Sequence, residues 1–417
     1  MSRIVIAGGN ILEGEVNVNG AKNAVLPILA ATILNGGINV IHNCPELKDV
    51  SASLQILEFL GCEVKRQGKT IIVDSSNIKD YRVPEQLMRE MRSSVIFLGS
   101  IISKCRKAVL SYPGGCEIGP RPIDLHLKAL RQLGIKINEA HGYIYCDAAR
   151  IDANDINLNF PSVGATENII LAAVMANGTT IIRNVAKEPE IVDLQDYLNA
   201  MGAKISGAGT SVIKIEGVEK LHDVEHTVIP DRIEGSTYLA AAAITGGTVK
   251  ITNVNPEHLQ AVLAALRECG CKIYVEKNTI TLSRTSTLQP VDVIRTLPYP
   301  GFPTDMQAPM MSVLTLARGT SIISETIFEN RFKHVEELMR MGADIMVDGR
   351  VAVIRGVEKL TGANVNAMDL RGGAALVIAG LAAEGSTVIE GVHHIDRGYE
   401  KIEDKLRLLG ADIKRVD

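Results

Sequence analysis

Six stretches of about ten residues are apolar on every side of the helix that each would form. Helices of this kind are buried inside a protein, and at this length they are too short to cross a bilayer. A glycine and a β-branched strand usually follow, as in Gly246–Val249. The pattern predicts six buried helices, at Ala24–Leu34, Ser93–Ile102, Ala165–Ala176, Ser236–Ile244, Met306–Ala317 and Gly373–Ala383.

A second helix-like segment follows each of these strands and ends in a large residue and a glycine. These glycines stand 68 to 73 residues apart along the whole chain. Such a period indicates repeated structural units. Each unit would consist of a buried helix, a strand, an amphipathic helix and two or three further strands. The glycines are Gly61, Gly134, Gly202, Gly270, Gly342 and Gly410.

The sixth unit lacks its closing strands, because only seven residues follow Gly410. The N-terminal segment Ile4–Leu12 parallels Ile213–Leu221 and Ala352–Leu360, which close two other units. We therefore expect the N-terminal segment to fold with the C-terminal half and complete it. The predicted fold class is α/β, with three units in each of two domains, residues 22–229 and residues 1–21 plus 230–417.

The composition argues against several classes of function. The 44 Lys and Arg residues nearly balance 48 Asp and Glu residues without any basic block, so a nucleic-acid or anionic-membrane surface is not expected. Tryptophan is absent and aromatic residues are only 4% of the chain, which removes the usual platforms for base stacking. We expect no nucleic-acid or membrane partner, and among oligomeric states we favour a monomer.

The cysteines and the start of the chain indicate a soluble, cytoplasmic protein. Seven scattered cysteines fit a reducing compartment better than a disulfide framework. Cys269 and Cys271 lack the spacing of a zinc site and have no Cys or His pair nearby, so we expect no metal. The first residues contain too short an apolar run for a signal peptide.

One loop carries a candidate reactive thiol. The segment Ser111–Pro122 places Cys116 beside a glycine pair and Arg121 between two prolines. Glycine frees the backbone and proline forbids a helix, so the segment should form a loop. A thiol flanked by glycines is exposed, and a nearby arginine favours the reactive thiolate. The alternative is a surface loop whose cysteine is incidental.

Unusual polar residues recur at the same points of the units, at the starts of the helices. Helix N-termini carry exposed N–H groups and a partial positive charge, which suits phosphate. We therefore expect an anion-binding cleft between the domains, although any single one of these cations could be an ordinary surface residue. The residues expected to line it are Lys22, Arg92, Arg121, Arg331, Arg371 and Arg397.

The motifs of the chain resemble those of the UDP-N-acetylglucosamine enolpyruvyl transferases, within the enolpyruvyl transferase family. The resemblance runs from residue 1 to residue 417, and the cysteine loop Pro113–Pro122 is among the most specific motifs of that family. The family fold is an inside-out α/β barrel in two domains, which agrees with the six repeated units. The other motifs are Gly20–Ala24, Ser162–Thr166, Pro303–Gln307, Asp369–Gly373 and Ile395–Glu400.

The resemblance implies a reaction by addition and elimination. The 3'-hydroxyl of UDP-N-acetylglucosamine would attack phosphoenolpyruvate, and phosphate would leave, in the first committed step of bacterial peptidoglycan synthesis. No cofactor is implied, although a covalent phosphoenolpyruvate adduct could form on Cys116. The resemblance also implies that an epoxide of the fosfomycin type would alkylate this thiol.

The resemblance assigns roles to individual residues. Asp305 would be the base, Cys116 the acid, and Lys22 and Arg397 the other catalytic residues. Phosphoenolpyruvate would be bound by Lys22, Asn23, Arg121, Arg331, Arg371 and Arg397. UDP-N-acetylglucosamine would be bound by Asn23, Arg92, Arg121, Pro122, Ile123, Asp124, Leu125, Ser162, Val163, Gly164, Asp305 and Ile327. Supporting residues would be Asp369, Asp231, Arg232 and His394.

Some alternatives stay open at this point. Asp305 and Asp369 could each be a helix cap, a role that Asp takes readily. Phe160 stands where some family members carry a basic residue, which leaves a diphosphate contact from that position in question. Two rival functions are transfer to shikimate 3-phosphate, whose enzymes lack the cysteine loop, and binding of a nucleotide sugar without catalysis.

Overall fold

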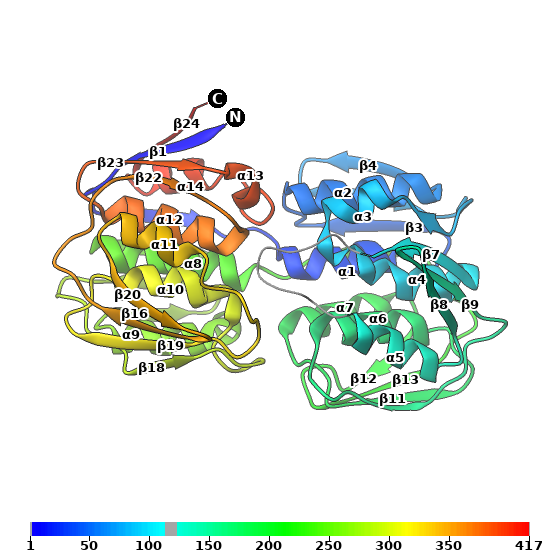
Figure 1. Cartoon of the computed structure of the whole chain (residues 1–417). Helices are drawn as coiled ribbons and strands as arrows, with labels where there is room; N and C mark the ends of the chain where they lie inside the picture. The colour runs from blue at the N-terminus through cyan, green and yellow to red at the C-terminus, as the bar shows by residue number, and fades with distance from the viewer. Residues whose placement is uncertain (1, 113–122, 417) are drawn as a thin grey trace. The chain divides into compact units, whose positions relative to one another are not determined.

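The computed structural model describes residues 2–112 and 123–416 of the chain, apart from the side chain of Arg92. The chain divides into two compact units (Figure 1). Among the described residues, the first unit holds 2–19 and 230–416, and the second holds 20–112 and 123–229. Within these ranges, no helix combines the length and the apolar character needed to span a membrane.

The described residues of each unit form three four-stranded sheets, and these six sheets share one strand order. In one sheet of the first unit, the edge strand β18 (Val293–Arg295) pairs in parallel with β19 (Thr320–Ser324). The strand β21 (Val351–Arg355) then pairs antiparallel with both β19 and β20 (Asp344–Asp348). A helix joins the first two strands, and a second helix joins β19 to the β20–β21 hairpin.

The other two sheets of the first unit include N-terminal strands. The strand β1 (Arg3–Ala7) lies antiparallel between β23 (Ser386–Glu390) and β24 (Asp412–Val416), and β2 (Glu13–Asn17) pairs in parallel with β15 (Thr248–Thr252). Ile4 and Ile6 alternate with exposed or half-buried neighbours and are fully buried, as period-two patterning requires. The remaining strands are β16 (Lys272–Glu276), β17 (Thr279–Ser283) and β22 (Asn364–Asn366).

The second unit repeats this arrangement three times. Its first sheet contains β14 (Val224–Thr227), β3 (Ile38–His42), β5 (Thr70–Asp74) and β4 (Glu63–Gln67). The second contains β6 (Arg82–Val83), β7 (Lys107–Ser111), β9 (Tyr143–Asp147) and β8 (Lys136–Ala140). The third contains β10 (Asp155–Asn157), β11 (Thr179–Arg183), β13 (Val212–Glu216) and β12 (Lys204–Ser206).

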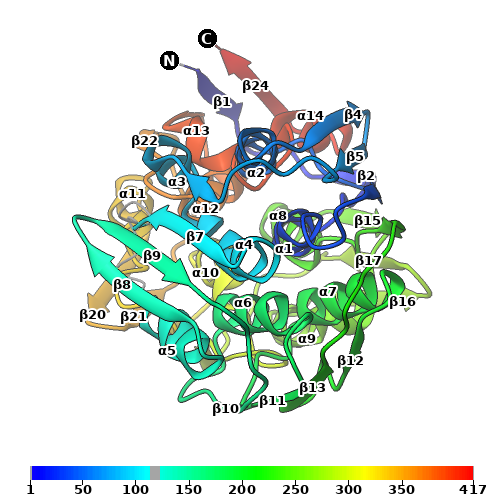
Figure 2. The ribbon, with the colours of Figure 1, turned by 90° about the vertical axis from the view of Figure 1, so that its right-hand side faces the viewer.

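Three inner helices occupy the core of each unit, with the sheets arranged outside them (Figures 1 and 2). In the second unit they are α1 (Lys22–Ala31), α4 (Phe97–Cys105) and α6 (Val163–Ala173), and in the first unit α8 (Arg232–Thr245), α10 (Gln307–Leu314) and α12 (Leu370–Ala382). Nearly all of their residues are buried, so each unit has its own apolar core. The predicted inside-out, two-domain α/β fold is confirmed.

The outer helices explain the glycine period. They are α2 (Lys48–Leu60), α5 (Asp124–Gln132), α7 (Pro189–Ala200), α9 (Gln260–Glu268), α11 (His334–Arg340) and α14 (Ile402–Leu408). The six repeated glycines follow their ends, and all six have φ between 83° and 102°. This left-handed conformation ends a helix and favours glycine, because a Cβ atom would be strained there.

Shorter helices complete the structure and correct one prediction. These are α3 (Glu85–Glu90), α13 (Val392–Ile395) and the 3₁₀ helices η1 (Arg92–Ile96), η2 (Pro256–Leu259) and η3 (Thr304–Met306). The stretch predicted as one helix at Ser93–Ile102 is therefore η1 followed by α4. Four inner helices also begin earlier than predicted: α6 begins at Val163, and the other three have a charged residue buried in the first turn, namely Lys22, Arg232 or Arg371.

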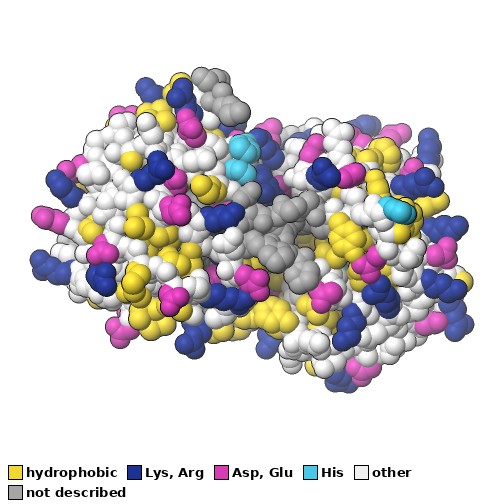
Figure 3. Space-filling model, in the orientation of Figure 1, with side chains coloured by type: hydrophobic (Ala, Val, Ile, Leu, Met, Phe, Trp, Pro, Cys, Tyr) yellow, Lys and Arg dark blue, Asp and Glu magenta, His cyan; other side chains and the backbone are white. Residues whose placement is uncertain are grey.

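The surface agrees with the balanced charge of the sequence. On the face shown in Figure 3, the Lys and Arg side chains of each unit are interspersed with Asp and Glu. No extended basic patch covers the described residues on this face.

Candidate active site

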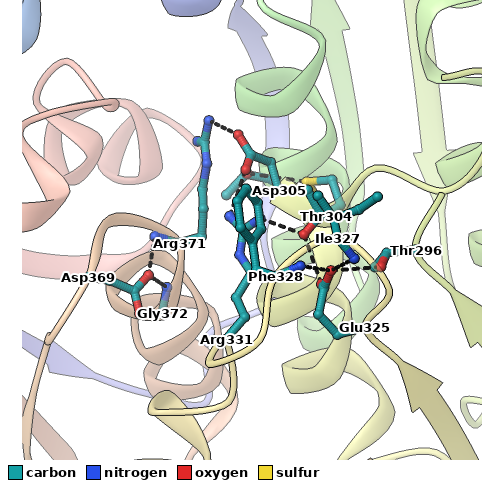
Figure 4. A network of polar contacts seen from close by, with 12 residues as sticks. Thr296, Thr304, Asp305, Glu325, Ile327, Phe328, Arg331, Asp369, Arg371 and Gly372 are labelled. Atoms are coloured by element: carbon teal, nitrogen blue, oxygen red, sulfur yellow. Dashed lines mark hydrogen bonds and ion pairs between the residues drawn. The ribbon is translucent and has the colours of Figure 1, made fainter. Parts of the chain in front are cut away.

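The carboxylate of Asp305 lies between two arginines of the first unit (Figure 4). Arg331 donates from Nη2 to Asp305 Oδ1 at 2.6 Å, and Arg371 donates from Nη2 to Oδ2 at 3.0 Å. Both guanidinium groups are almost fully buried, while the Asp305 side chain is 25% exposed. Asp305 lies inside η3, whose N-cap is Pro303, so the alternative role of Asp305 as a helix cap is wrong.

The two arginines set the charge of Asp305. Burial alone would raise the pKa of the Asp305 carboxyl, but the charges of Arg371 and Arg331 and their hydrogen bonds hold it well below its usual range. Asp305 is therefore ionised at neutral pH. A carboxylate held in this way is a weak base until some other anion draws the guanidinium groups from it.

Arg371 reaches this site from the first turn of α12. Asp369 caps that helix by accepting from the backbone N–H groups of Arg371 and Gly372 at 3.0 and 2.8 Å. The close approach of Asp369 to this helix start requires glycine at position 372. A Cβ there would lie 2.9 Å from Asp369 Oδ2 and 3.0 Å from His334 Cβ. The guanidinium of Arg371 also lies 5.2 Å from the centre of the Tyr399 ring. The cap and the ring fix the direction of the arginine.

Arg331 is held from two further sides. Its Nη1 donates to Thr304 Oγ1 at 2.6 Å, and its guanidinium lies 5.0 Å from the centre of the Phe328 ring. Three guanidinium nitrogens of the site are buried without a hydrogen-bond partner among the described residues. They are Nε of Arg331 and both Nε and Nη1 of Arg371. Buried cationic donors of this kind suit an anionic ligand with several oxygens.

Glu325 is a member of this network that the sequence analysis missed. It follows β19 and is only 1% exposed, and its carboxylate accepts from the hydroxyls of Thr296 and Thr304 (Figure 4). It also accepts from the backbone N–H of Ile327, a predicted nucleotide-sugar residue, at 2.8 Å. A single Glu after a strand carries no pattern that distinguishes it from an ordinary surface residue.

In the second unit, Lys22 is a buried cation. It stands in the first turn of α1, and its Nζ lies 2.7 Å from Asp49 Oδ2 in the first turn of α2. Both side chains are less than a tenth exposed. Asn23, next in the chain, is half-buried. Asp49 was also missed, because an acidic residue in the first turn of an amphipathic helix is common.

Two predicted nucleotide-sugar segments meet in the second unit. Ser162 caps α6 by accepting from the Ala165 N–H at 3.3 Å, and Val163 and Gly164 form its first turn. A Cβ at Gly164 would lie 3.1 Å from His126 Cε1, and His126 belongs to α5 directly after Ile123, Asp124 and Leu125. Burial lowers the pKa of His126 to about 4, so the ring is neutral.

The remaining predicted residues lie elsewhere or outside the described part of the chain. Asp231 caps α8 by accepting from the N–H groups of Ile233 and Glu234, and Arg232 lies 5.6 Å from the centre of the Tyr299 ring. His394 is in α13, and Arg397 is half-buried in the turn after it. Phe160 is exposed. Cys116, Arg121, Pro122 and the Arg92 side chain are not among the described residues.

Comparisons with known proteins agree with this fold. The family model described as EPSP synthase (3-phosphoshikimate 1-carboxyvinyltransferase) matches residues 6–406. The chain is 58% identical to UDP-N-acetylglucosamine 1-carboxyvinyltransferase 2 of Caldanaerobacter subterraneus subsp. tengcongensis, over the full length of both chains. It is 53% identical to UDP-N-acetylglucosamine 1-carboxyvinyltransferase 1 of Carboxydothermus hydrogenoformans, covering 100% of this chain and 99% of that one.

Solved structures give the same result for the fold. The enolpyruvyl transferase NikO from Streptomyces tendae superimposes with a TM-score of 0.90 at 27% identity, over 100% of this chain and 99% of that one. The EPSP synthase of Acinetobacter baumannii reaches 0.76 at 18% identity over the full length of both chains, which supports the fold alone.

The α/β fold of six repeated units is thus shared with enolpyruvyl transferases of known structure. The chain belongs to the EPSP synthase family. Within that family, the resemblance to UDP-N-acetylglucosamine enolpyruvyl transferases that the motifs indicated is confirmed, as is the enzyme class.

Proposed function

We propose that this chain transfers the enolpyruvyl group of phosphoenolpyruvate to the 3'-hydroxyl of UDP-N-acetylglucosamine and releases phosphate. This is the first committed step of bacterial peptidoglycan synthesis. Relatives of full length that carry the corresponding name support the pair of substrates. The observation that supports the chemistry is the Asp305 site, where one ionised carboxylate and two buried guanidinium groups lie together.

The reaction needs a base, an acid and a set of cations. The hydroxyl oxygen of the sugar adds to C2 of phosphoenolpyruvate while its proton passes to a base, and C3 takes up a proton from an acid. In the second step C3 gives up a proton and the bond from C2 to the phosphate oxygen breaks, which restores the double bond. Positive charge around the phosphate and carboxylate stabilises both steps.

In this proposal, Asp305 accepts the proton of the sugar hydroxyl. Its present hydrogen bonds make it a weak base, but an entering phosphate or carboxylate would compete with it for Arg331 and Arg371. As those cations turn to the substrate, the basicity of Asp305 rises at the moment when a proton must be removed. The guanidinium N–H groups that lack a partner among the described residues would supply donors for that exchange.

The other residues keep the roles that the motifs imply. Lys22, Arg121 and Arg397 would hold phosphoenolpyruvate, beside Asn23, and Cys116 would protonate C3 and form a covalent adduct that affects product release. The nucleotide sugar would be bound through the segments 121–125 and 162–164, Asn23, Arg92, Asp305 and Ile327. Asp231, Arg232, Asp369 and His394 would support these groups. Because arginines supply the charge, we propose that no metal ion is needed.

We also propose a cytoplasmic location and a monomeric state. Six described cysteines are free, which suits a reducing compartment.

Phosphate release from phosphoenolpyruvate tests the proposal. Turnover is expected with UDP-N-acetylglucosamine and not with shikimate 3-phosphate, and it should fall at least about 100-fold in Asp305→Ala, as expected when a general base is lost. Loss in Cys116→Ser would place the thiol in bond making, whereas survival in that variant would restrict it to product release. Wild-type enzyme that binds the nucleotide sugar tightly but releases no phosphate would contradict the proposal and favour a binding protein.

A further inference from the structure

Glu325 is a buried carboxylate that accepts four hydrogen bonds. Its Oε1 accepts from Thr296 Oγ1 at 2.9 Å and from the backbone N–H groups of Ile327 and Phe328 at 2.8 and 3.1 Å. Its Oε2 accepts from Thr304 Oγ1 at 2.8 Å. All four partners lie in loops or at helix starts around the Asp305 site (Figure 4). A carboxylate with this number of donors holds their positions together.

The hydrogen bond to Thr304 has only one possible direction. The Thr304 hydroxyl has one proton, and the guanidinium of Arg331 can donate but cannot accept. Because Arg331 Nη1 donates to Thr304 Oγ1, the hydroxyl proton must point to Glu325. By accepting this proton, Glu325 leaves the Thr304 oxygen free to accept from Arg331. Thr304 thereby fixes Nη1 of the guanidinium, whose Nη2 donates to Asp305.

The same carboxylate also acts on the opposite side of Arg331. By holding the N–H of Phe328, it fixes the loop whose aromatic ring lies 5.0 Å from the guanidinium of Arg331. By holding the N–H of Ile327, it fixes a residue proposed to bind the nucleotide sugar. Glu325 thus contacts both the acceptor that binds Arg331 and the loop that covers it.

We propose that Glu325 is a positioning residue of the transferase reaction, which orients Arg331 against Asp305 through the hydroxyl of Thr304. The inference rests on the roles given to Asp305 and Arg331 in the proposed function. It explains why the guanidinium of Arg331 directs Nη1 to Thr304 and Nη2 to Asp305. It assigns to Glu325 no contact with substrate.

The substitution Glu325→Gln separates this role from packing, because it keeps the shape of the side chain. Three donors converge on Oε1, so the amide oxygen of Gln would lie there and the amide NH₂ would face Thr304. The NH₂ then donates to Thr304, and the hydroxyl proton loses its acceptor and competes with Arg331. The loop of Ile327 and Phe328 keeps its acceptor.

We expect Glu325→Gln to lower kcat by about 10- to 100-fold, as a displaced catalytic group does, while the KM for UDP-N-acetylglucosamine changes little. The acid limb of the kcat/KM profile should move to higher pH, because a loosely held Arg331 stabilises the Asp305 carboxylate less. Thr304→Val should give the same two changes, and the double variant should lose little more than either single one.

The matched control is Thr296→Val. It removes another hydroxyl donor from the same carboxylate but leaves the contacts of Thr304 and Arg331 intact. Its melting temperature should fall, while kcat and the acid limb should stay near those of the wild type. If Glu325→Gln folds poorly, the kinetics of Thr304→Val are compared with those of Thr296→Val instead.

The outcomes separate this inference from the proposed function. If Asp305→Ala loses activity while Glu325→Gln and Thr304→Val keep the wild-type kcat and acid limb, the inference on Glu325 fails and the function stands. If Thr296→Val shows the same kinetic changes as Thr304→Val, Glu325 has only a structural role. If Asp305→Ala itself retains wild-type turnover, the proposed base and this inference both fail.

Discussion

Replacing Asp305 by Asn perturbs the charge of the site with almost no change of volume. The amide oxygen can accept from one guanidinium, but the amide NH₂ faces the other, so one hydrogen bond and the compensating charge are lost. Arg331 and Arg371 then remain as two buried like charges. Breaking a buried ion pair by removing one partner costs about 3–5 kcal/mol.

The partial exposure of Asp305 determines how much stability the Asp305→Asn variant loses. Because its side chain is 25% exposed, water screens part of the interaction, and we expect the lower end of that range, about 3 kcal/mol. For a domain of roughly 200 residues, this corresponds to a fall of about 6–12 °C in the melting temperature of the unit that holds Asp305. Scanning calorimetry measures this. Asp344→Asn is the control, since its pair with Arg355 is half-exposed and should change stability by less than about 0.5 kcal/mol.

The pH dependence has a definite sign. The folded state lowers the pKa of Asp305, so its ionised form stabilises the fold above the unfolded pKa of about 3.9, and this stabilisation is lost as the pH falls through the lower folded value. The difference in unfolding free energy between wild type and Asp305→Asn should therefore be constant from about pH 7 to pH 5 and shrink only below about pH 4. Equal melting temperatures for the two proteins at pH 7 would refute the reasoning.

Two further predictions concern thiols and glycines. An epoxide of the fosfomycin type should alkylate Cys116 and leave the other six thiols intact. Burial raises the pKa of each of those six thiols, to about 12 for Cys44, and so disfavours the reactive thiolate. Peptide mass spectrometry of the native enzyme would contradict this prediction by finding an adduct on any of the six. Gly356→Ala should destabilise the first unit by about 3 kcal/mol or more, because its Cβ would overlap the carbonyl oxygen of Ala317. For Gly349→Ala, none of the described atoms lies within 4 Å of the added Cβ, so the change should cost only the strain of its positive φ, about 1–2 kcal/mol. Equal urea denaturation midpoints for the two variants would argue against the overlap at Gly356.

The repeated architecture could be read from the sequence because its signals are local. Each outer helix ends at a glycine with positive φ, and each inner helix is apolar on all sides, so both leave a period in the chain. The starts of the inner helices were placed too late where a charged residue opens them. Lys22 and Arg371 are buried there because Asp49 and Asp305 balance their charges, and pattern alone gives such residues to the surface.

The acidic partners of the site could not be found in the same way. Asp49 and Glu325 acquire their roles only when the fold brings Lys22 or Thr304 beside them. Asp49 stands in the first turn of an outer helix, where an acidic residue is common, and Glu325 stands outside the shared helix-start position of the repeats. Asp305 could be found, because it stands at that position and in a recognisable motif. Its two arginine partners were also named, although as ligands for phosphoenolpyruvate, and their hydrogen bonds to Asp305 were not predicted.

The placement of β1 has a consequence for synthesis of the chain on the ribosome. This strand is completed at Ala7, but its neighbours β23 and β24 begin at Ser386 and Asp412, so at about 5–20 residues per second it waits roughly 20–80 s for them. During that time Ile4 and Ile6 lack the sheet that buries them. The described residues of the second unit, 20–112 and 123–229, are all synthesised before residue 230, so this unit can fold while the first is still being translated. Strand β1 is therefore a segment that a chaperone would have to protect during synthesis.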